Sequence, residues 1–317
     1  MNVCLMPNFN RPEYLKLCTD LILKSQGARD NLYLFALDYG FDSKLLEVIN
    51  KFPLASKIIK TPNKISGNMK QSFNVLNGLL EAYKLSDNLI YIIEDDIFIG
   101  RDFFKFHEAV QSNKLFCSIA TKNHNSNFTM LNDLNAYYYG YSMDYQSLGV
   151  CMNKNSIDLI RPHINDDYFS NPQDYVSKNF NSFLGSSYCE QDGLIRRIRE
   201  ESNLEVAFPH IPRAYHAGFY GYHRYSNLPK TKTYEEKVSM LKRICFSKEE
   251  MKKVCLNDLY YFDSEPIDLD TDFTEMKLIQ TKIGIGLKPG LNTKNNMHIP
   301  QKKFRKGALT ARGLVYN

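Results

Sequence analysis

The sequence predicts an α/β fold whose mostly parallel sheet is flanked by helices. In the first hundred residues, short apolar segments alternate with segments of helical periodicity. Each apolar segment ends in polar, glycine or proline residues, and the last one ends in three consecutive carboxylates. Strands that alternate with helices favour a parallel sheet, and such a sheet binds ligands at the carboxyl ends of its strands.

The expected elements follow in order along the chain. Pro12 suits the first turn of the first helix, and Ser43 is the expected N-cap of the second. Strands are expected over residues 3–6, 32–37, 56–60, 88–93 and 115–120, and helices after Pro12 and Ser43 and over residues 68–85, 102–113, 190–200 and twice within 234–256.

Two segments fit this alternation less well. The Tyr-rich residues 137–145 are expected to form a strand pair. Residues 161–182 contain Pro162, Pro172 and many Asn and Asp residues, and they are expected to form an acceptor-side loop or lid.

We expect neither a signal peptide nor a membrane span, and the cysteines show no disulfide pattern. The N-terminal residues 1–7 lack the basic and apolar regions of a signal peptide, and eighteen consecutive apolar residues occur nowhere. Seven cysteines, an odd number without a C-x-x-C pair, indicate free thiols in a reducing compartment. We therefore expect a cytoplasmic protein with no transmembrane segment.

The charge is unevenly distributed along the sequence. The formal net charge is +5, but all 35 acidic residues lie at or before Glu275, whereas nine of the 40 Lys and Arg residues follow it. This asymmetry divides the chain into an expected catalytic domain over residues 1–270 and an extended basic arm over residues 271–317.

Glu94, Asp95 and Asp96 directly follow the apolar run 89–93. Adjacent carboxylates at the edge of a core are costly unless a cation neutralises them. Oxygen ligands suit Mg²⁺ or Mn²⁺, which would bridge to the phosphate oxygens of a substrate. The alternative is a solvated acidic turn.

Several motifs, in order, resemble the nucleotide-sugar contacts of the GT-A (Rossmann-like) glycosyltransferase fold. More narrowly, they resemble the N-acetylglucosaminyltransferase I family, glycosyltransferase family 13. The motifs are Asn10-Arg11-Pro12, Leu37-Asp38-Tyr39-Gly40, Tyr91-Ile92-Ile93-Glu94-Asp95-Asp96, Cys189-Glu190-Gln191-Asp192-Gly193 and the segment from Pro212 to Gly221 with its R-x-x-H-x-G-x-x-G pattern.

The resemblance implies a role for each donor-side residue and a UDP-sugar as the favoured donor. Arg11 would contact the nucleotide phosphates or base, and Asp38 would accept a hydrogen bond from a uracil imide. Asp96 would bind the metal directly, with Asp95 on the sugar or ribose and Glu94 supporting the cluster.

The same resemblance implies an inverting displacement. Asp192 would be the general base that deprotonates the acceptor hydroxyl, and His216 would help to hold the metal or the diphosphate. The family has a tryptophan beside its catalytic acid, whereas this chain has no Trp, so Glu190 stays an alternative base. Residues 66–70 replace the basic, aromatic segment of the family, which leaves the nucleotide and the sugar open.

The acceptor is interpreted from the basic arm. Unopposed positive charges suit a phosphate backbone, and the tyrosines of residues 137–141 would stack an extruded base. These features favour a hydroxymethylated pyrimidine in double-stranded DNA, as in DNA modification by bacteriophages. The residues expected to contact DNA are Lys302, Lys303, Arg305, Lys306 and Arg312.

Other functions stay open. A cytoplasmic glycosyltransferase that acts on a glycan or a protein hydroxyl would use the basic arm on anionic lipid. A catalytically inactive protein would only bind a nucleotide-sugar or nucleic acid. A nucleotidyltransferase would also use carboxylates and a divalent ion, but it needs a second metal-binding carboxylate on a neighbouring strand.

Overall fold

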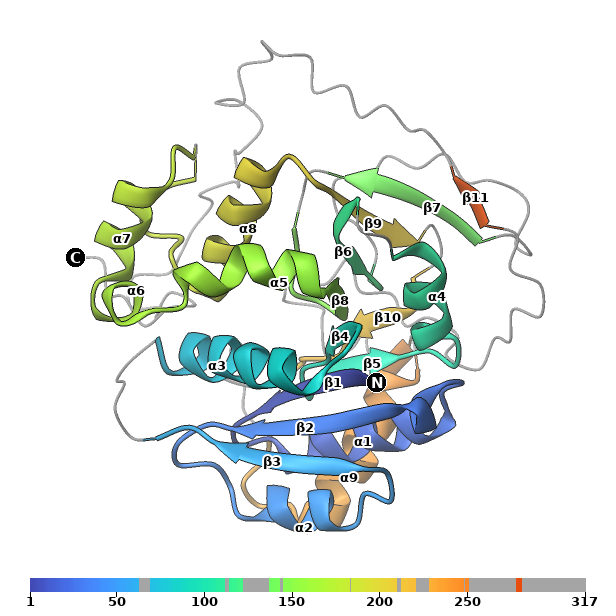
Figure 1. Cartoon of the computed structure of the whole chain (residues 1–317). Coiled ribbons are helices and arrows are strands. Elements are labelled where there is room, and N and C mark those ends of the chain that lie inside the picture. The colour runs from blue at the N-terminus through green and yellow to red at the C-terminus, as the bar shows by residue number, and fades with distance from the viewer. Residues whose placement is uncertain are drawn as a thin grey trace.

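A computed structural model provides the structure of the chain (Figure 1). It describes residues 1–62, 69–111, 114–121, 145–182, 184–209, 212–220, 228–247 and 249–250, and the backbone of residues 137–142 and 278–280.

The strands of the described residues form a nine-stranded sheet and a separate two-stranded ribbon. The order in the sheet is β11-β7-β9-β6-β8-β4-β1-β2-β3, and the ribbon pairs β10 with β5. The strands are β1 (Asn2–Asn8), β2 (Asn31–Leu37), β3 (Ser56–Lys60), β4 (Leu89–Ile92), β5 (Ile97–Ile99), β6 (Leu115–Ile119), β7 (Tyr137–Ser142), β8 (Val150–Asn153), β9 (Glu205–Pro209), β10 (Ala214–His216) and β11 (Leu278–Gln280).

The strands β3, β2, β1 and β4 are all parallel, so their carboxyl ends meet at one edge. The β8 strand lies antiparallel between β4 and β6, whereas β6 pairs with β9 in parallel. The predicted fold class, an α/β fold with a mostly parallel sheet flanked by helices, is confirmed.

Helices cover both faces of the sheet (Figure 1). One hydrophobic core lies between the sheet and helices α1, α2, α4 and α9, and a second core lies on the opposite face beneath α3, α5, α6, α7 and α8. The helices are α1 (Pro12–Lys24), α2 (Lys44–Asn50), α3 (Met69–Leu85), α4 (Phe103–Val110), α5 (Lys154–Ile160), α6 (Asp166–Ser170), α7 (Pro172–Asn179), α8 (Gln191–Ser202) and α9 (Tyr234–Cys245), with short 3-10 turns at Ala28–Asp30 and Arg161–His163.

The central strands are buried on both faces. In β1, Cys4 and Met6 enter one core, whereas Val3 and Leu5 enter the other, as the two-residue period of a strand requires. The β2 strand alternates in the same way and is buried along its whole length. Such strands have no exposed face, so polar side chains that could bind a ligand lie beyond the ends of the strands.

The prediction of a loop over residues 161–182 is wrong. The segment contains a 3-10 turn and the helices α6 and α7. Asn165 accepts a hydrogen bond from the backbone N–H of Tyr168, and Asn171 does the same for Asp174. Pro172 occupies the first turn of α7. The Asn and Pro residues therefore mark helix starts.

Two further expectations need correction. The helix that begins at Lys44 does start after Ser43, but the Ser43 side chain makes no capping bond; the backbone N–H of Lys44 instead donates to Asp42. Within the described residues of the segment 137–145, residues 137–142 form one strand, β7, which pairs with β9 and β11. The β11 strand lies within the predicted basic arm, and the domain boundary at residue 270 stays a prediction.

The described cysteines are free thiols, as predicted. Six of them are buried and unbridged, and Cys255 lies outside the described residues. None of the helices in the described ranges combines the length and apolarity that a bilayer span needs.

The imidazole of His107 generates a pH prediction. It is fully buried in α4, its Nδ1 lies 2.7 Å from the Ser118 Oγ, and burial lowers its pKa to about 3. Between this value and its usual pKa of about 6.5, the unfolded chain binds one more proton than the folded chain. The free energy of unfolding should therefore fall as the pH falls through this window, by up to about 1.4 kcal/mol per pH unit from this group.

Urea unfolding of wild type and His107→Phe at a series of pH values checks this expectation. The variant should lose stability less steeply on acidification. His163→Phe is the matched control and should have a smaller effect, because His163 is only partly buried. If the free energy of unfolding depended on pH equally in wild type and His107→Phe, the lowered pKa of His107 would be contradicted.

Candidate functional site

The candidate site lies where the parallel strands end. Residues after β1 include Arg11, those after β2 include Asp38, and those after β4 include Glu94 to Asp96. Because β1 lies between β2 and β4, these three strand ends are neighbours in space. The sequence expectation of a polar site at this edge therefore has a direct structural basis.

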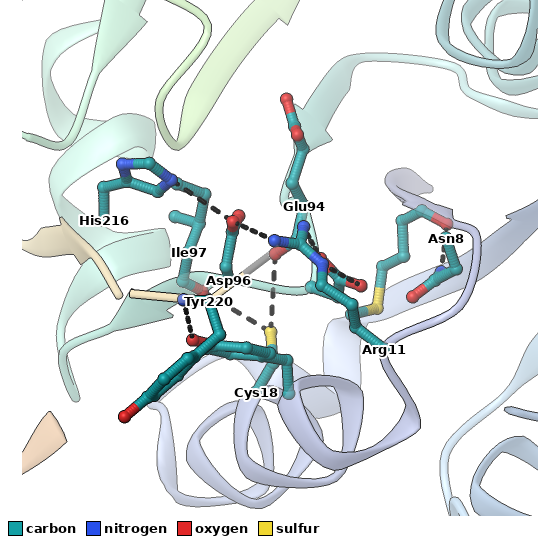
Figure 2. A network of polar contacts seen from close by, with 11 residues as sticks. Asn8, Arg11, Cys18, Glu94, Asp96, Ile97, His216 and Tyr220 are labelled. Carbon is teal, nitrogen blue, oxygen red and sulfur yellow. Dashed lines mark hydrogen bonds and ion pairs between the residues drawn. The ribbon is translucent and has the colours of Figure 1, made fainter. Parts of the chain in front are cut away.

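Arg11 neutralises two of the carboxylates. Its Nε lies 3.2 Å from the Asp95 Oδ2, its Nη2 donates to the Asp95 Oδ1, and its Nη1 lies 2.6 Å from the Asp96 Oδ2 (Figure 2). The side chains of Asp95 and Asp96 are only 3% and 7% exposed. Tyr14 lies beneath the guanidinium, with its ring centroid 5.3 Å from the Arg11 Cζ.

The ribbon formed by β5 and β10 brings His216 to the same site. His216 pairs with Ile97 across the ribbon, and the backbone N–H of Ala217 donates to the Asp96 carbonyl at 2.7 Å. As a result, the His216 Nε2 lies 3.2 Å from the Asp96 Oδ2 (Figure 2).

Gly218 keeps space open between these two side chains. A Cβ at this position would lie 2.5 Å from the Asp96 Oδ2 and 2.6 Å from the His216 Nε2. Any larger residue would therefore fill the space that both side chains face.

The charges of the cluster are strongly perturbed. At Asp96, burial favours the neutral form, but Arg11 and His216 outweigh it and lower the pKa well below its usual range. Burial raises the pKa of Asp95 to about 6 although Arg11 opposes this. Burial, followed by the charges of Asp96 and Asp192, raises the pKa of Glu94 well above its usual range. Asp96 is thus the best-stabilised anion of the three.

The chemistry of the donor set fits a divalent cation in part. Asp96 offers a carboxylate oxygen, His216 offers an imidazole nitrogen, and Gly218 leaves room between them. Across the described ranges, no group of three or more His, Cys, Asp or Glu side chains has the arrangement of a complete metal site. Two protein ligands suit an ion that takes its other ligands from a diphosphate and water.

A second group of side chains surrounds Asp38. Its Oδ1 accepts the backbone N–H of Tyr39 at 2.7 Å, and burial raises its pKa against the opposing effects of that bond and of Lys70. The Lys70 Nζ lies 5.6 Å from the centroid of the Phe9 ring and 5.2 Å from that of Tyr39. Phe9 and Tyr39 are 41% and 44% exposed, so two aromatic faces and a cation lie beside a buried carboxylate.

The N-terminal end of α8 carries the two candidate bases. Glu190 is its N-cap residue, Asp192 lies in the first turn, and both are partly buried. Gln191 fixes this end of the helix, because its backbone N–H donates to the Ser72 Oγ on α3 at 3.2 Å and the Ser72 hydroxyl donates to its side chain. The charge of Asp192 acts on Glu94, so the helix end lies within electrostatic range of the acidic cluster.

Arg197 shapes the loop before α8, a role that no local sequence signal indicates. Its buried guanidinium donates to the backbone carbonyls of Tyr188, Gly193, Leu184 and Gly185 at 2.5 to 3.1 Å. A Cβ at Gly193 would lie 2.1 Å from the Tyr188 carbonyl oxygen. The E-x-D-G sequence therefore needs its glycine for close packing.

The Arg213 side chain anchors the segment that carries His216. Its Nη1 lies 3.3 Å from the Asp102 Oδ2, and both side chains are nearly inaccessible. The Gly100 backbone N–H also donates to the Arg213 carbonyl at 2.8 Å. These contacts lie directly beside β10, so Arg213 positions the ribbon.

The predicted site residues fall into three groups. Arg11, Asp95, Asp96 and His216 make direct contacts, whereas Glu94 points away from Arg11 in Figure 2. Asp38 follows the end of β2, and Glu190 and Asp192 lie at the N-terminal end of α8. The DNA-contact residues Lys302, Lys303, Arg305, Lys306 and Arg312 lie outside the described residues, as do the side chains of residues 137–141.

Sequence reasoning missed several residues of this region: Phe9, Tyr14, Lys70, Arg197 and Gly218. Only Gly218 had a signal, since it belongs to the R-x-x-H-x-G-x-x-G pattern. Phe9 and Lys70 contact each other although they are distant in the sequence. Tyr14 and Arg197 have partners nearby in the sequence, Arg11 and Gly193, but no motif marks these contacts.

No protein family and no curated protein sequence matches the chain. Solved structures are similar to it at low identity. TarS from S. aureus is 11% identical over 82% of this chain and 76% of that one, with a TM-score of 0.43. The mannosyltransferase PcManGT from Pyrobaculum calidifontis, in complex with GDP-Man and Mn²⁺, is 9% identical over 84% and 66%, with a TM-score of 0.41.

The galactosyltransferase LgtC is 8% identical over 66% of this chain and 73% of that one, with a TM-score of 0.40. At these identities and TM-scores, the similarities identify neither a family nor an activity for this chain. The likeness to the N-acetylglucosaminyltransferase I family remains a resemblance of motifs.

The buried Arg213–Asp102 pair generates a stability prediction. Arg213→Met should lower the free energy of unfolding by about 3 to 5 kcal/mol, because Asp102 stays buried without the guanidinium. The double variant Arg213→Met with Asp102→Leu should recover much of this loss. Urea unfolding followed by circular dichroism measures both. A double variant no more stable than the single one would contradict the pairing.

Proposed function

We propose that the chain is a metal-dependent, inverting glycosyltransferase that uses a nucleotide-sugar, with a UDP-sugar favoured. The observation that carries the proposal is the convergence of Arg11, Asp96 and His216 at the carboxyl ends of parallel strands. The Arg11 guanidinium and the space kept open by Gly218 at this edge suit the diphosphate of an activated sugar.

The neighbouring residues supply the rest of a donor site. Asp38 would accept an N–H of the nucleobase, and the exposed rings of Phe9 and Tyr39 would stack against the base. Arg11 would pair with the phosphates through its planar fork of N–H groups. Asp95 would accept a hydroxyl of the ribose or sugar.

Asp96 and His216 are the proposed protein ligands of Mn²⁺ or Mg²⁺. When bound, the ion would neutralise charge that develops on the diphosphate leaving group. Glu94 would support the cluster, and its charge interacts with that of Asp192.

Asp192 is the proposed general base, with Glu190 as the alternative. Its carboxylate would take the proton from the acceptor hydroxyl as that oxygen bonds to the anomeric carbon and the bond to the diphosphate breaks. The effect of the Asp192 charge on Glu94 supports Asp192 as the base, because Glu94 follows β4 on the proposed donor side.

For the acceptor we propose a hydroxymethylated pyrimidine in double-stranded DNA. Support comes from the sequence of the basic arm, whose nine positive charges are unopposed. A glycan or protein hydroxyl is the second candidate. The bacteriophage setting and the cytoplasmic location stay predictions.

A transfer assay tests the donor and the acceptor together. The full chain is incubated with a panel of UDP-sugars and with DNA that contains hydroxymethylcytosine or hydroxymethyluracil, in the presence of Mn²⁺ or of EDTA. The two measurements are the release of UDP and the mass of the digested nucleosides. We expect UDP release only with metal, and a sugar mass on the modified base. UDP release without labelled DNA would redirect the acceptor to glycans and proteins.

Asp96→Asn is the matched variant for this assay. It keeps the size of the side chain, so the fold should persist while UDP release is lost. Undiminished UDP release by Asp96→Asn, or by wild type in EDTA, would refute the metal assignment. Absence of UDP release from every donor by the wild type would refute the function.

Substitution of the two candidate bases separates their roles. Asp192→Asn should lower kcat for transfer by about 10²- to 10⁴-fold, because proton removal from the acceptor is lost. Glu190→Gln should change kcat by less than about tenfold, since this residue would lack that role. Equal Kd values for UDP in both variants would show an intact donor site, and the reverse order of kcat values would make Glu190 the base.

A further inference from the structure

Arg11 satisfies two buried carboxylates at once. Three of its N–H groups reach Asp95 and Asp96, and the two carboxylates are nearly inaccessible to solvent. Removal of a cation from such a cluster leaves buried negative charge without compensation. The guanidinium is therefore the counter-ion of the acidic cluster in the structure as described.

The position of Arg11 conflicts with that of a divalent cation. Its Nη1 lies 2.6 Å from the Asp96 Oδ2, the same oxygen that lies 3.2 Å from the His216 Nε2. A cation bound to Asp96 and His216 would lie at roughly 2.0 to 2.2 Å from a carboxylate oxygen. A guanidinium in contact with the same oxygen would then face a dication at close range in a poorly solvated site.

We infer that Arg11 is an internal counter-ion that occupies the cation position of the site, and that a divalent cation replaces it when the donor diphosphate draws the guanidinium away. The inference rests on the proposed donor site. It assigns Arg11 two successive partners, the carboxylates first and the diphosphate second.

The surroundings of Arg11 permit this exchange. The residue precedes α1 and follows the end of β1, so its side chain starts from a connection between two elements. Its side chain is 25% exposed, whereas its carboxylate partners are almost covered. Phosphate matches the guanidinium fork as well as carboxylate does, and Tyr14 offers a ring face beside it.

The exchange has a consequence for binding. When no nucleotide is present, a dication that displaces Arg11 leaves the guanidinium with no phosphate to pair with. The metal alone should therefore bind weakly. With UDP present, the guanidinium moves to a phosphate and the carboxylate is released. Metal and donor should therefore bind cooperatively, and each should raise the affinity for the other by the same factor.

Direct titration of Mn²⁺, followed by the electron paramagnetic resonance of the free ion, tests this inference. In the absence of nucleotide, Arg11→Met should bind Mn²⁺ at least about tenfold more tightly than wild type. UDP should increase the Mn²⁺ affinity of wild type more than that of Arg11→Met. Equal Mn²⁺ affinity of wild type and Arg11→Met would overturn the inference.

Two control variants make the result specific. Arg213→Met also removes a buried guanidinium from a carboxylate, but that carboxylate, Asp102, lies outside the cluster. Because Arg213 positions the ribbon that carries His216, the Mn²⁺ affinity of this variant should be equal to or lower than that of wild type. Arg11→Lys keeps a positive charge and should stay close to wild type. A gain in Arg213→Met or Arg11→Lys equal to that of Arg11→Met would overturn the inference as well.

Stability gives a second readout if Arg11→Met folds poorly. Mn²⁺ should raise the Tm of Arg11→Met more than that of wild type or Arg213→Met, or restore its circular dichroism if it is unfolded without metal. No such rescue would contradict the counter-ion role. Metal-dependent UDP release by the wild type tests the proposed function separately, so either can fail while the other stands.

Discussion

The burial of the central strands on both faces is the constraint from which the rest of the structure follows. Cys4 and Met6 point into one core and Val3 and Leu5 into the other, so β1 offers no surface for a polar site. Polar side chains appear as soon as the strands leave the core. Arg11, Asp38 and the cluster that ends at Asp96 share one edge because their strands are parallel neighbours.

Much of this architecture could be predicted from the sequence, because period-two and helical patterns are local. The same locality explains the failures. Asn165 and Asn171 have a composition that is typical of loops, and only their capping bonds identify them as helix starts. The acidic cluster could be placed at a strand end, but the approach of His216 could not be derived from spacing, because it depends on the pairing of β5 with β10.

Three arginines illustrate why residue type alone does not reveal a role. Arg197 donates to backbone carbonyls and shapes a loop, Arg213 pairs with Asp102 and anchors a ribbon, and Arg11 pairs with the carboxylates at the strand ends. The guanidiniums of Arg197 and Arg213 are covered, whereas the Arg11 side chain is 25% exposed. The inferred exchange with a phosphate is therefore open to Arg11 alone among the three. The difference lies in what surrounds each group, which the sequence does not contain.

The ribbon between β5 and β10 also joins two segments that are synthesised at different times. His216 lies 120 residues after Asp96 in the sequence, whereas Arg11 precedes the cluster. During synthesis, β1, β2 and β4 are complete long before His216 emerges, and contacts of such large sequence separation form late in folding. A nascent N-terminal half would therefore bury its carboxylates with Arg11 alone as their partner. The Arg11 guanidinium would then compensate the buried carboxylates of this unfinished fold until β10 and His216 are added.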